Sequence, residues 1–124
     1  MDKERNIAAV RTAFDAYVAK DRAAIEAVMA EDLRFTSPYD NRIDRKTYFE
    51  RCWPNSEQSA GFEFIHLAAD GDQVFVTYEG RSKNGHKGRN TEVFTVRDGK
   101  ITEVEVYFGW NVPHEAAPGG FVNP

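Results

Sequence analysis

The sequence predicts a single α+β domain in which helices come first and an antiparallel sheet follows. Apolar residues recur at helical spacing between Ile7 and Val18. In the second half of the chain the spacing changes, and Asx-Gly turn signals at residues 70–71, 84–85 and 98–99 separate β-rich segments. Helices followed by a continuous meander are typical of the α+β class, and we expect the helices to cover one face of the sheet.

Capping and breaking residues delimit the next elements. Asp21 is the predicted N-cap of a second helix that runs toward Asp32. A short strand over residues 33–37 follows, and Pro38 ends it because proline cannot continue a sheet ladder.

Residues 38–44 form a predicted polar loop, and Asp44 is the predicted N-cap of a third helix that Pro54 stops after Trp53. We interpret the loop as solvated. The alternative is that one of its side chains folds over the mouth of a pocket: Tyr39, Asp40 or Arg42.

Four strands complete the predicted meander, over residues 62–69, 73–82, 88–97 and 100–109. From Asn111 onward the sequence is rich in proline and glycine and predicts an extended tail. We therefore expect one domain over residues 1–110 and a tail over residues 111–124.

Composition argues against several classes of function. The chain has 124 residues and a formal net charge of −4, which does not favour nucleic acid. No segment approaches the ~18 apolar residues of a membrane span, so we expect no membrane partner. Cys52 is the single cysteine and the N-terminus does not resemble a signal peptide, so we expect a cytoplasmic protein. We interpret one basic cluster as a solvated hairpin tip: Lys83, His86, Lys87 and Arg89.

The common catalytic and metal-binding motifs are missing from the sequence. The three histidines do not fall at metal-ligand spacing, and there is no paired-cysteine motif, phosphate-binding glycine loop or nucleophile elbow. We therefore expect neither a metal nor a cofactor, and we interpret Cys52 as a buried, inert thiol.

Glu92 is the most informative residue for function. Alternation along its predicted strand places it on the same face as Phe94 and Val96. That face is apolar, so a carboxyl group there must be paired, protonated or placed in a cavity. Two interpretations stand open. Glu92 is either a pocket acid with a raised pKa or a structural carboxylate bonded to Asn90, Thr77, a tyrosine or a buried arginine.

The register of the last hairpin decides what faces Glu92. A two-residue turn would place Glu92 opposite Glu105, and directly opposed like charges are destabilising. A three-residue loop over residues 97–99, with Gly99 in the left-handed conformation, places Glu92 opposite Val104 instead, and we predict this register.

This register assigns the side chains of the two strands to two faces. The face of Glu92 also carries Phe94, Val96, Val104, Val106, Phe108 and Trp110. The opposite face, a candidate subunit interface or solvated surface, carries Thr91, Val93, Thr95, Glu103, Glu105 and Tyr107. The middle hairpin stays open: a two-residue turn puts Thr77 opposite Glu92, and a three-residue loop puts Val76 there.

Four stretches of the chain carry a resemblance to a known superfamily: residues 19–32, 35–38, 92–101 and 107–109. Their order resembles the nuclear transport factor 2-like superfamily and, within it, the SnoaL-like group of small bacterial proteins. The resemblance covers about residues 7–110. It implies a cone-shaped α+β fold in which three N-terminal helices pack on a curved antiparallel meander around an apolar pocket.

The resemblance also lets the functional positions of relatives be compared one by one. In ketosteroid isomerases of this fold the general base would fall at Ser37, an oxyanion-hole tyrosine near Ala13, and the protonated oxyanion-hole acid at Glu92. In limonene-epoxide hydrolases an Asp-Arg-Asp set would fall at Glu92, Asn90 and Val106, and polyketide cyclases place their acid near Val106. Each comparison keeps the acid at position 92 and loses its partners.

We therefore expect the pocket to bind a small, largely apolar molecule, with acid–base chemistry of isomerase, cyclase, dehydratase or hydrolase type assisted by Glu92. The alternative is a non-catalytic binding or dimeric assembly module without turnover. The resemblance implies a homodimer through the outer sheet face. Besides Glu92, the candidate ligand-binding residues are Phe14, Phe35, Ser37, Tyr39, Trp53, Asn90, Phe94, Val106, Phe108 and Trp110.

Overall fold

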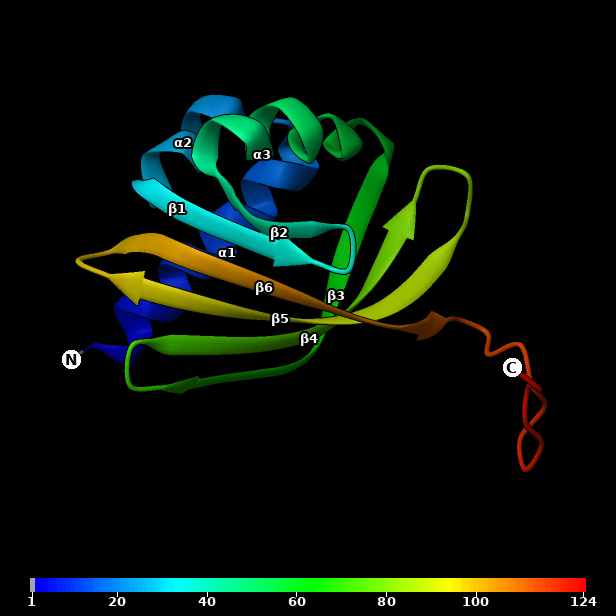
Figure 1. Ribbon diagram of the computed structural model, residues 1–124. Helices are drawn as coiled ribbons and strands as arrows, with labels where there is room; N and C mark the ends of the chain where they lie inside the picture. The colour runs from blue at the N-terminus through cyan, green and yellow to red at the C-terminus, as the bar shows by residue number, and fades with distance from the viewer. Residues whose placement is uncertain (1) are drawn as a thin grey trace.

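The computed structural model describes residues 2–124 as helices at the N-terminal end followed by a long antiparallel meander (Figure 1). The helices are α1 (Lys3–Ala19), α2 (Arg22–Val28), α3 (Arg45–Arg51) and the 3-10 helix η1 (Trp53–Gln58). The strands are β1 (Met29–Ser37), β2 (Asp40–Asp44), β3 (Ser59–Asp70), β4 (Gln73–Ser82), β5 (Lys87–Arg97) and β6 (Lys100–Asn111).

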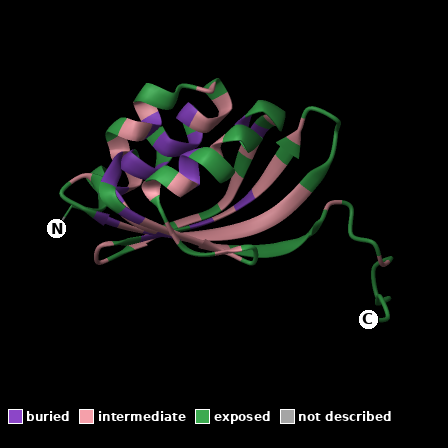
Figure 2. Cartoon of the chain, turned by 45° about the horizontal axis from the view of Figure 1, so that its top comes forward, coloured by how far each residue is buried: buried purple, intermediate pink, exposed green. Residues whose placement is uncertain are grey.

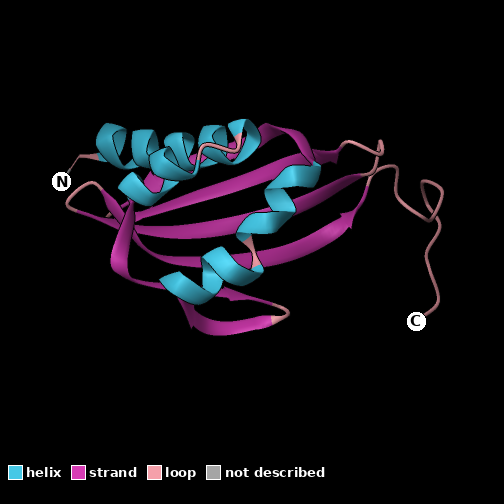
Figure 3. Cartoon of the chain, turned by 90° about the horizontal axis from the view of Figure 1, so that it is seen from above, coloured by secondary structure: helices cyan, strands magenta, loops and turns pink. Residues whose placement is uncertain are grey.

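The strands form one six-stranded sheet in the order β2-β1-β6-β5-β4-β3. All neighbouring pairs are antiparallel except β1 and β6, which run parallel. The sheet is curved, and the helices lie across its concave face (Figure 3). The predicted α+β, cone-shaped fold class is confirmed.

The core lies where α1 and α2 cover the sheet, and it occupies only part of the concave face (Figure 2). Val10 of α1 is completely buried against strand residues that include Leu33, Val74, Val76 and Ile101. Burying each such aliphatic side chain contributes about 1.5–3 kcal/mol to folding. Toward the β4–β5 hairpin the strands are less covered, so the concave face remains partly open.

Side-chain caps set the starts of the short helices, as the sequence indicates. The Asp21 carboxylate accepts a hydrogen bond from the Ala24 amide at 3.1 Å, and the Asp44 carboxylate accepts one from the Thr47 amide at 2.9 Å. The end of α2 was predicted wrongly. The helix stops at Val28 instead of running toward Asp32, because Met29 already pairs with β6 as the first residue of β1.

Two further boundaries differ from the prediction. The segment 38–44 is not only a loop: residues 40–44 form β2, which pairs with β1 through contacts such as Phe35 with Ile43. The third helix ends at Arg51 rather than after Trp53, and the chain continues as η1 with Pro54 in its first turn. A 3-10 turn tolerates proline there because its first amides need no helical partner.

The register of the last hairpin also differs from the prediction. Arg97 pairs with Lys100, so the turn has two residues, and a bulge between the pairs of Thr95 and Val96 then shifts the strands. Glu92 consequently lies opposite Val106 and not opposite Val104. The bulge inserts one extra residue into β6, so Glu92 and Glu105 are not opposed. The predicted three-residue loop would have had the same effect. Each side chain therefore stays on the face that was predicted for it.

The middle hairpin adopts the second of the two open registers. Val76 lies opposite Glu92, and Tyr78 lies opposite Asn90. The Ser82 amide donates to the His86 carbonyl at 2.8 Å, which closes a three-residue loop. This register places Val74, Val76 and Tyr78 on the same face as Glu92.

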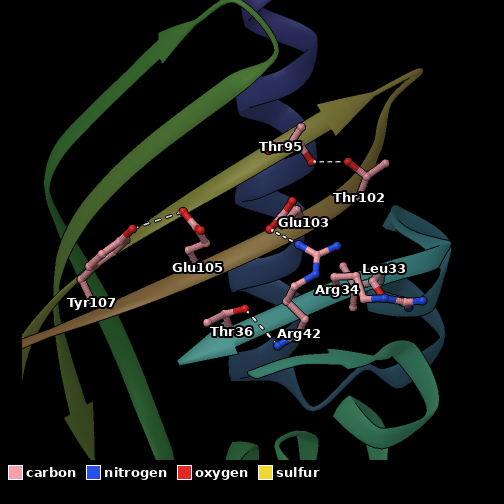
Figure 4. Close-up of polar contacts among 9 residues, drawn as sticks. All are labelled: Leu33, Arg34, Thr36, Arg42, Thr95, Thr102, Glu103, Glu105 and Tyr107. Carbon is pink, nitrogen blue, oxygen red and sulfur yellow. Dashed lines mark hydrogen bonds and ion pairs between the residues drawn. The ribbon is translucent and has the colours of Figure 1, made fainter. Parts of the chain in front are cut away.

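The convex face of the sheet is half-buried to exposed and mixes polar with apolar residues. Figure 4 shows several of its polar side chains. Cross-strand pairing on this face joins Thr91 with Tyr107, Val93 with Glu105, and Thr95 with Glu103. Arg42 Nη1 forms an ion pair with Glu103 Oε2 at 3.0 Å, and the Tyr107 hydroxyl donates to Glu105 at 3.2 Å. The six residues predicted for the outer face therefore share it.

Beyond Asn111 the chain contains no helix or strand and leaves the far end of the sheet (Figure 1). Among residues 2–124, none of the helices has the length and apolar composition that a bilayer crossing requires.

Candidate functional site

A cavity of about 700 Å³ lies between the concave face of the sheet and the helices. This volume is in the range of pockets that enclose small organic ligands. Its inner wall is aromatic and centres on Phe14 of α1. The Phe14 ring contacts four other rings edge-on at centroid distances of 5.0–5.7 Å: Phe62, Phe64, Tyr78 and Phe94.

Glu92 lines this cavity from the middle of β5, and its side chain belongs to a short chain of hydrogen bonds. The Tyr78 hydroxyl on β4 donates to Glu92 Oε2 at 2.5 Å. Asn90 Nδ2 donates to the Tyr78 hydroxyl at 3.3 Å, and the Gly109 amide donates to Asn90 Oδ1 at 3.4 Å. Alternation brings Asn90 and Glu92 to one face of β5, and the register brings Tyr78 opposite them.

The surroundings of Glu92 change its protonation. Burial raises the pKa of its carboxyl group from 4.5 to about 7, although the hydrogen bond from Tyr78 acts in the opposite direction. Within residues 2–124, Tyr78 is the one hydrogen-bond partner of this carboxyl group, and no ion pair involves it. Glu92 can therefore donate or accept a proton near neutral pH.

Two further tyrosines line the same cavity, Tyr17 from α1 and Tyr48 from α3. Burial, and then the nearby charge of Glu92, raise the pKa of Tyr17. Burial is also the main cause that raises the pKa of Tyr48. Both hydroxyls are therefore neutral at ordinary pH. Because neither bonds to another side chain among residues 2–124, both are able to hydrogen-bond a guest molecule.

Asp40 lines the rim of the cavity, and both of its oxygens are engaged. Arg51 Nε contacts Oδ1 at 2.5 Å, and the Ser37 hydroxyl donates to Oδ2 at 2.7 Å. Burial alone would raise the pKa of Asp40, but the hydrogen bonds from Ser37 and Arg51 outweigh it and lower the pKa. Asp40 therefore joins the β1–β2 hairpin to α3 as an ionised anchor.

Cys52 also faces the cavity and lies 3.9 Å from Asp40. Burial, and then the Asp40 charge, raise the pKa of its thiol to about 11. A thiol that stays protonated is a poor nucleophile and a poor metal ligand. Across residues 2–124, no group of three potential ligands among His, Cys, Asp and Glu is arranged to hold a metal.

The structure brings nearly all of the predicted site residues to this cavity. Its lining includes Phe14, Phe35, Ser37, Tyr39, Asn90, Glu92, Phe94, Val106, Phe108 and Trp110. Trp53 is the exception: it does not line the cavity but packs against Tyr17 at 5.8 Å and Phe49 at 6.0 Å. The third helix ends at Arg51, before Trp53, and Trp53 begins η1 instead of continuing the helix.

Several residues that line the cavity were not predicted from the sequence as site residues. Phe62 lay within a predicted strand but was not assigned to a face, and bulges on either side of it in β3 interrupt the alternation. Asp40 was interpreted as part of a solvated loop, yet both it and Tyr39 line the rim, while Arg42 turns to the convex face. The alternation that groups Tyr78 with Val74 was a usable signal for its contact with Glu92.

N-terminal helices packed on a curved six-stranded sheet are the architecture of a nuclear transport factor 2-like protein. A family model described as a SnoaL-like domain matches residues 10–104. The chain belongs to this SnoaL-like family.

Solved structures show the same fold. A candidate ketosteroid isomerase from Kribbella flavida is 19% identical, with 99% of this chain and 84% of that chain covered and a TM-score of 0.74. An NTF2-like protein of unknown function from Burkholderia pseudomallei is 18% identical, with 88% and 92% covered and a TM-score of 0.69. An LEH-like epoxide hydrolase from M. tuberculosis is 25% identical, with 86% and 84% covered and a TM-score of 0.70. A search of curated proteins found no match.

Proposed function

We propose that the protein binds a small, largely apolar molecule in its cavity, and that Glu92 donates a hydrogen bond or a proton to an oxygen atom of that molecule. The observation that carries the proposal is the position of Glu92. It lines a cavity of about 700 Å³ as a carboxyl group whose pKa burial raises to about 7. Acids with raised pKa values in pockets are enriched at functional sites.

The polar groups around Glu92 support a role in orienting an oxygen-bearing ligand. Tyr17 and Tyr48 add two neutral hydroxyls to an otherwise aromatic wall. An apolar pocket with few polar groups is typical of small-molecule sites, because the polar groups fix orientation while the apolar wall provides affinity. Two further observations support this role. The space between the sheet and the helices is a cavity and is not filled by side chains. Among residues 2–124, Glu92 forms no ion pair that would fix its carboxyl group.

A binding module without turnover is the second candidate, and the state of Asp40 favours it. Proton transfer between two sites of a substrate needs a second group that can accept a proton. Asp40 is the other carboxylate of the lining, and both of its oxygens are occupied by Arg51 and Ser37. Acid–base catalysis by this chain would therefore depend on Glu92 alone, or on Glu92 with a tyrosine or with His86, which also lines the cavity.

A matched pair of ligands tests the role of Glu92. N-phenyl-1-naphthylamine, whose fluorescence rises in apolar sites, serves as the probe, and 2-acetylnaphthalene and 2-isopropylnaphthalene compete with it. The two competitors have similar shapes, but only the first has an oxygen that can accept a hydrogen bond. At pH 5.5 the protonated Glu92 should favour the ketone by roughly 5-fold, and at pH 8.5 the preference should fall to the part that the tyrosine hydroxyls provide.

Two variants complete this test. Glu92→Gln keeps a neutral donor and should prefer the ketone at both pH values, whereas Glu92→Leu keeps only the tyrosine hydroxyls and should show a smaller preference that does not change with pH. A ketone preference in Glu92→Leu equal to that of the wild type would show that Glu92 does not contact the ligand. Failure of the probe to bind the wild type would overturn the binding function itself.

A further inference from the structure

The cavity extends well beyond the aromatic wall that surrounds Glu92. Its lining continues along the same face of β5 through Asn90 to Gly88, and it includes the hairpin residue His86. Gly88 lies four residues from Glu92, which corresponds to about 13 Å along a strand. A ligand that binds Glu92 and also occupies the far part of the cavity is therefore elongated, and its far end lies beside the β4–β5 hairpin.

The lining changes from aromatic to polar at a pair of glycines. Gly80 of β4 lies directly opposite Gly88 of β5, and strand alternation places both on the face of Glu92. A Cβ atom at Gly80 would meet the rings of Phe62 and Tyr78 at 3.5 Å. The neighbours of Gly88 are polar instead, so this pair marks the boundary between two parts of the cavity.

Three polar atoms converge on the space above Gly88. A Cβ atom there would lie 3.8 Å from the Trp110 carbonyl oxygen, 3.9 Å from His86 Nε2 and 4.0 Å from Asn111 Oδ1. All three residues line the cavity, and Asn111 pairs directly with Gly88 across the sheet. Because glycine has no side chain, the space between the three atoms can hold a group of the ligand.

The side chains of His86 and Asn111 are available to bind such a group. Among residues 2–124, neither the imidazole nor the amide hydrogen-bonds to another protein group, and only the backbone amide of His86 donates to Asn84, at 2.9 Å. A neutral imidazole and a primary amide each offer a donor and an acceptor. They therefore match a ligand group that both donates and accepts, such as a hydroxyl or a primary amide.

Exposed aromatic rings lie beside the stretch between the two polar ends. Phe108 lies opposite Asn90, between the positions of Glu92 and Gly88. Its ring contacts the ring of Tyr39 at a centroid distance of 5.6 Å, and both residues line the cavity. Phe108 is 51% exposed and Tyr39 is 76% exposed. Neighbouring apolar side chains that stay this exposed are typical of a groove that a ligand covers.

We propose that the ligand is an elongated amphiphile with a second polar group, a hydroxyl or a primary amide, that binds His86 and Asn111 above Gly88. This group lies about 13 Å from the oxygen atom that Glu92 binds. The apolar segment between the two contacts Phe108. This inference rests on the proposed binding function and adds the length and the second polar end of the ligand.

Three naphthyl ketones that displace N-phenyl-1-naphthylamine test the inference. 2-Acetylnaphthalene is short, 1-(2-naphthyl)octan-1-one adds an apolar chain, and 8-hydroxy-1-(2-naphthyl)octan-1-one ends that chain in a hydroxyl. The double variant His86→Phe/Asn111→Leu removes the hydrogen-bonding groups and keeps the approximate size of two exposed side chains, so it should fold. It should lose roughly 3- to 10-fold in affinity for the hydroxy ketone and lose none for the other two.

Two further variants show whether the effect belongs to the space above Gly88. His66→Phe/Asn123→Leu makes the same exchanges at exposed positions outside the cavity lining and should leave all three affinities unchanged. Gly88→Leu fills the space and should weaken both long ketones. It should leave 2-acetylnaphthalene unchanged, because that ketone ends before it reaches residue 88.

The outcomes separate this inference from the binding function. The second polar end is overturned if the His86/Asn111 variant binds the hydroxy ketone as tightly as the wild type, or loses both long ketones equally. It is also overturned if the control variant loses as much, or if long-ketone binding survives Gly88→Leu. Each of these results leaves the binding function intact. Failure of N-phenyl-1-naphthylamine to bind the wild type would overturn the proposed function itself.

Discussion

At the scale of single residues, the chemistry of Glu92 follows from its position on an apolar strand face. Tyr78 satisfies one of its oxygens, and the cavity leaves the other available. The sequence predicted an acid on this face from alternation alone. It could not choose between a pocket acid and a structural carboxylate, because that choice depends on whether the concave face is filled by distant helices.

The raised pKa of Glu92 makes stability depend on pH. The folded protein keeps the proton up to about pH 7, whereas the ordinary value is 4.5. The contribution of Glu92 to the free energy of unfolding is therefore fully present below about pH 4.5 and is lost as pH rises through 7. Glu92→Gln, which cannot ionise, should be more stable than the wild type at pH 8, by up to about 3 kcal/mol, and nearly equal at pH 4.5.

Urea denaturation of both proteins at the two pH values measures this difference. The measurement at pH 4.5 is the internal control, because it reports the effect of the amide without that of the charge. A difference of the same size at both pH values would contradict a buried, weakly acidic Glu92.

At the scale of elements, helix caps were predictable, whereas strand pairings and bulges were not. The caps at Asp21 and Asp44 need only neighbouring amides, and both were predicted. The early end of α2 depends on the pairing of Met29 with Ile101, far along the chain. The strand β2 and the bulge that moves Glu92 opposite Val106 belong to hairpins of neighbouring strands. No residue near those points announces the partner, which is why these boundaries and this register were predicted wrongly.

The cap of α2 can be tested directly, since α2 carries Ile25 to the wall of the cavity. Asp21→Ala removes the acceptor for the Ala24 amide and should reduce the free energy of unfolding by about 1 kcal/mol. Asp21→Asn keeps an acceptor and should change it little. Thermal or urea unfolding of the two variants compares them, and equal losses would show that the cap does not stabilise α2.

At the scale of the whole molecule, the sheet has two different faces. The concave face holds the core and the cavity, and the convex face is left open with Val93 and Tyr107 among its residues. We propose that two copies pair through this convex face, as the family resemblance implies. The fold itself was predictable because the order of helices, turns and strands is specific for it, whereas the assembly depends on a surface that no sequence pattern fixes.

A charge placed at the centre of the convex face tests this assembly. Val93→Lys should convert a dimer into a monomer, because burying an unpaired ammonium group in an interface is costly. Analytical ultracentrifugation of the wild type and the variant measures the mass of each. The exposed N-terminal substitution Lys3→Ala is the control and should remain a dimer. A wild type that sediments as a monomer would contradict the proposed pairing.

The most direct test of the central claim is a pH titration of the Glu92 carboxyl group by carbon-13 NMR, with Glu92→Gln used to assign the signal. We expect a midpoint near pH 7 in the free protein. We also expect a higher midpoint once N-phenyl-1-naphthylamine fills the cavity and excludes water from the carboxyl group. A midpoint near 4.5 that the probe does not move would contradict the claim that Glu92 is a ligand-facing acid.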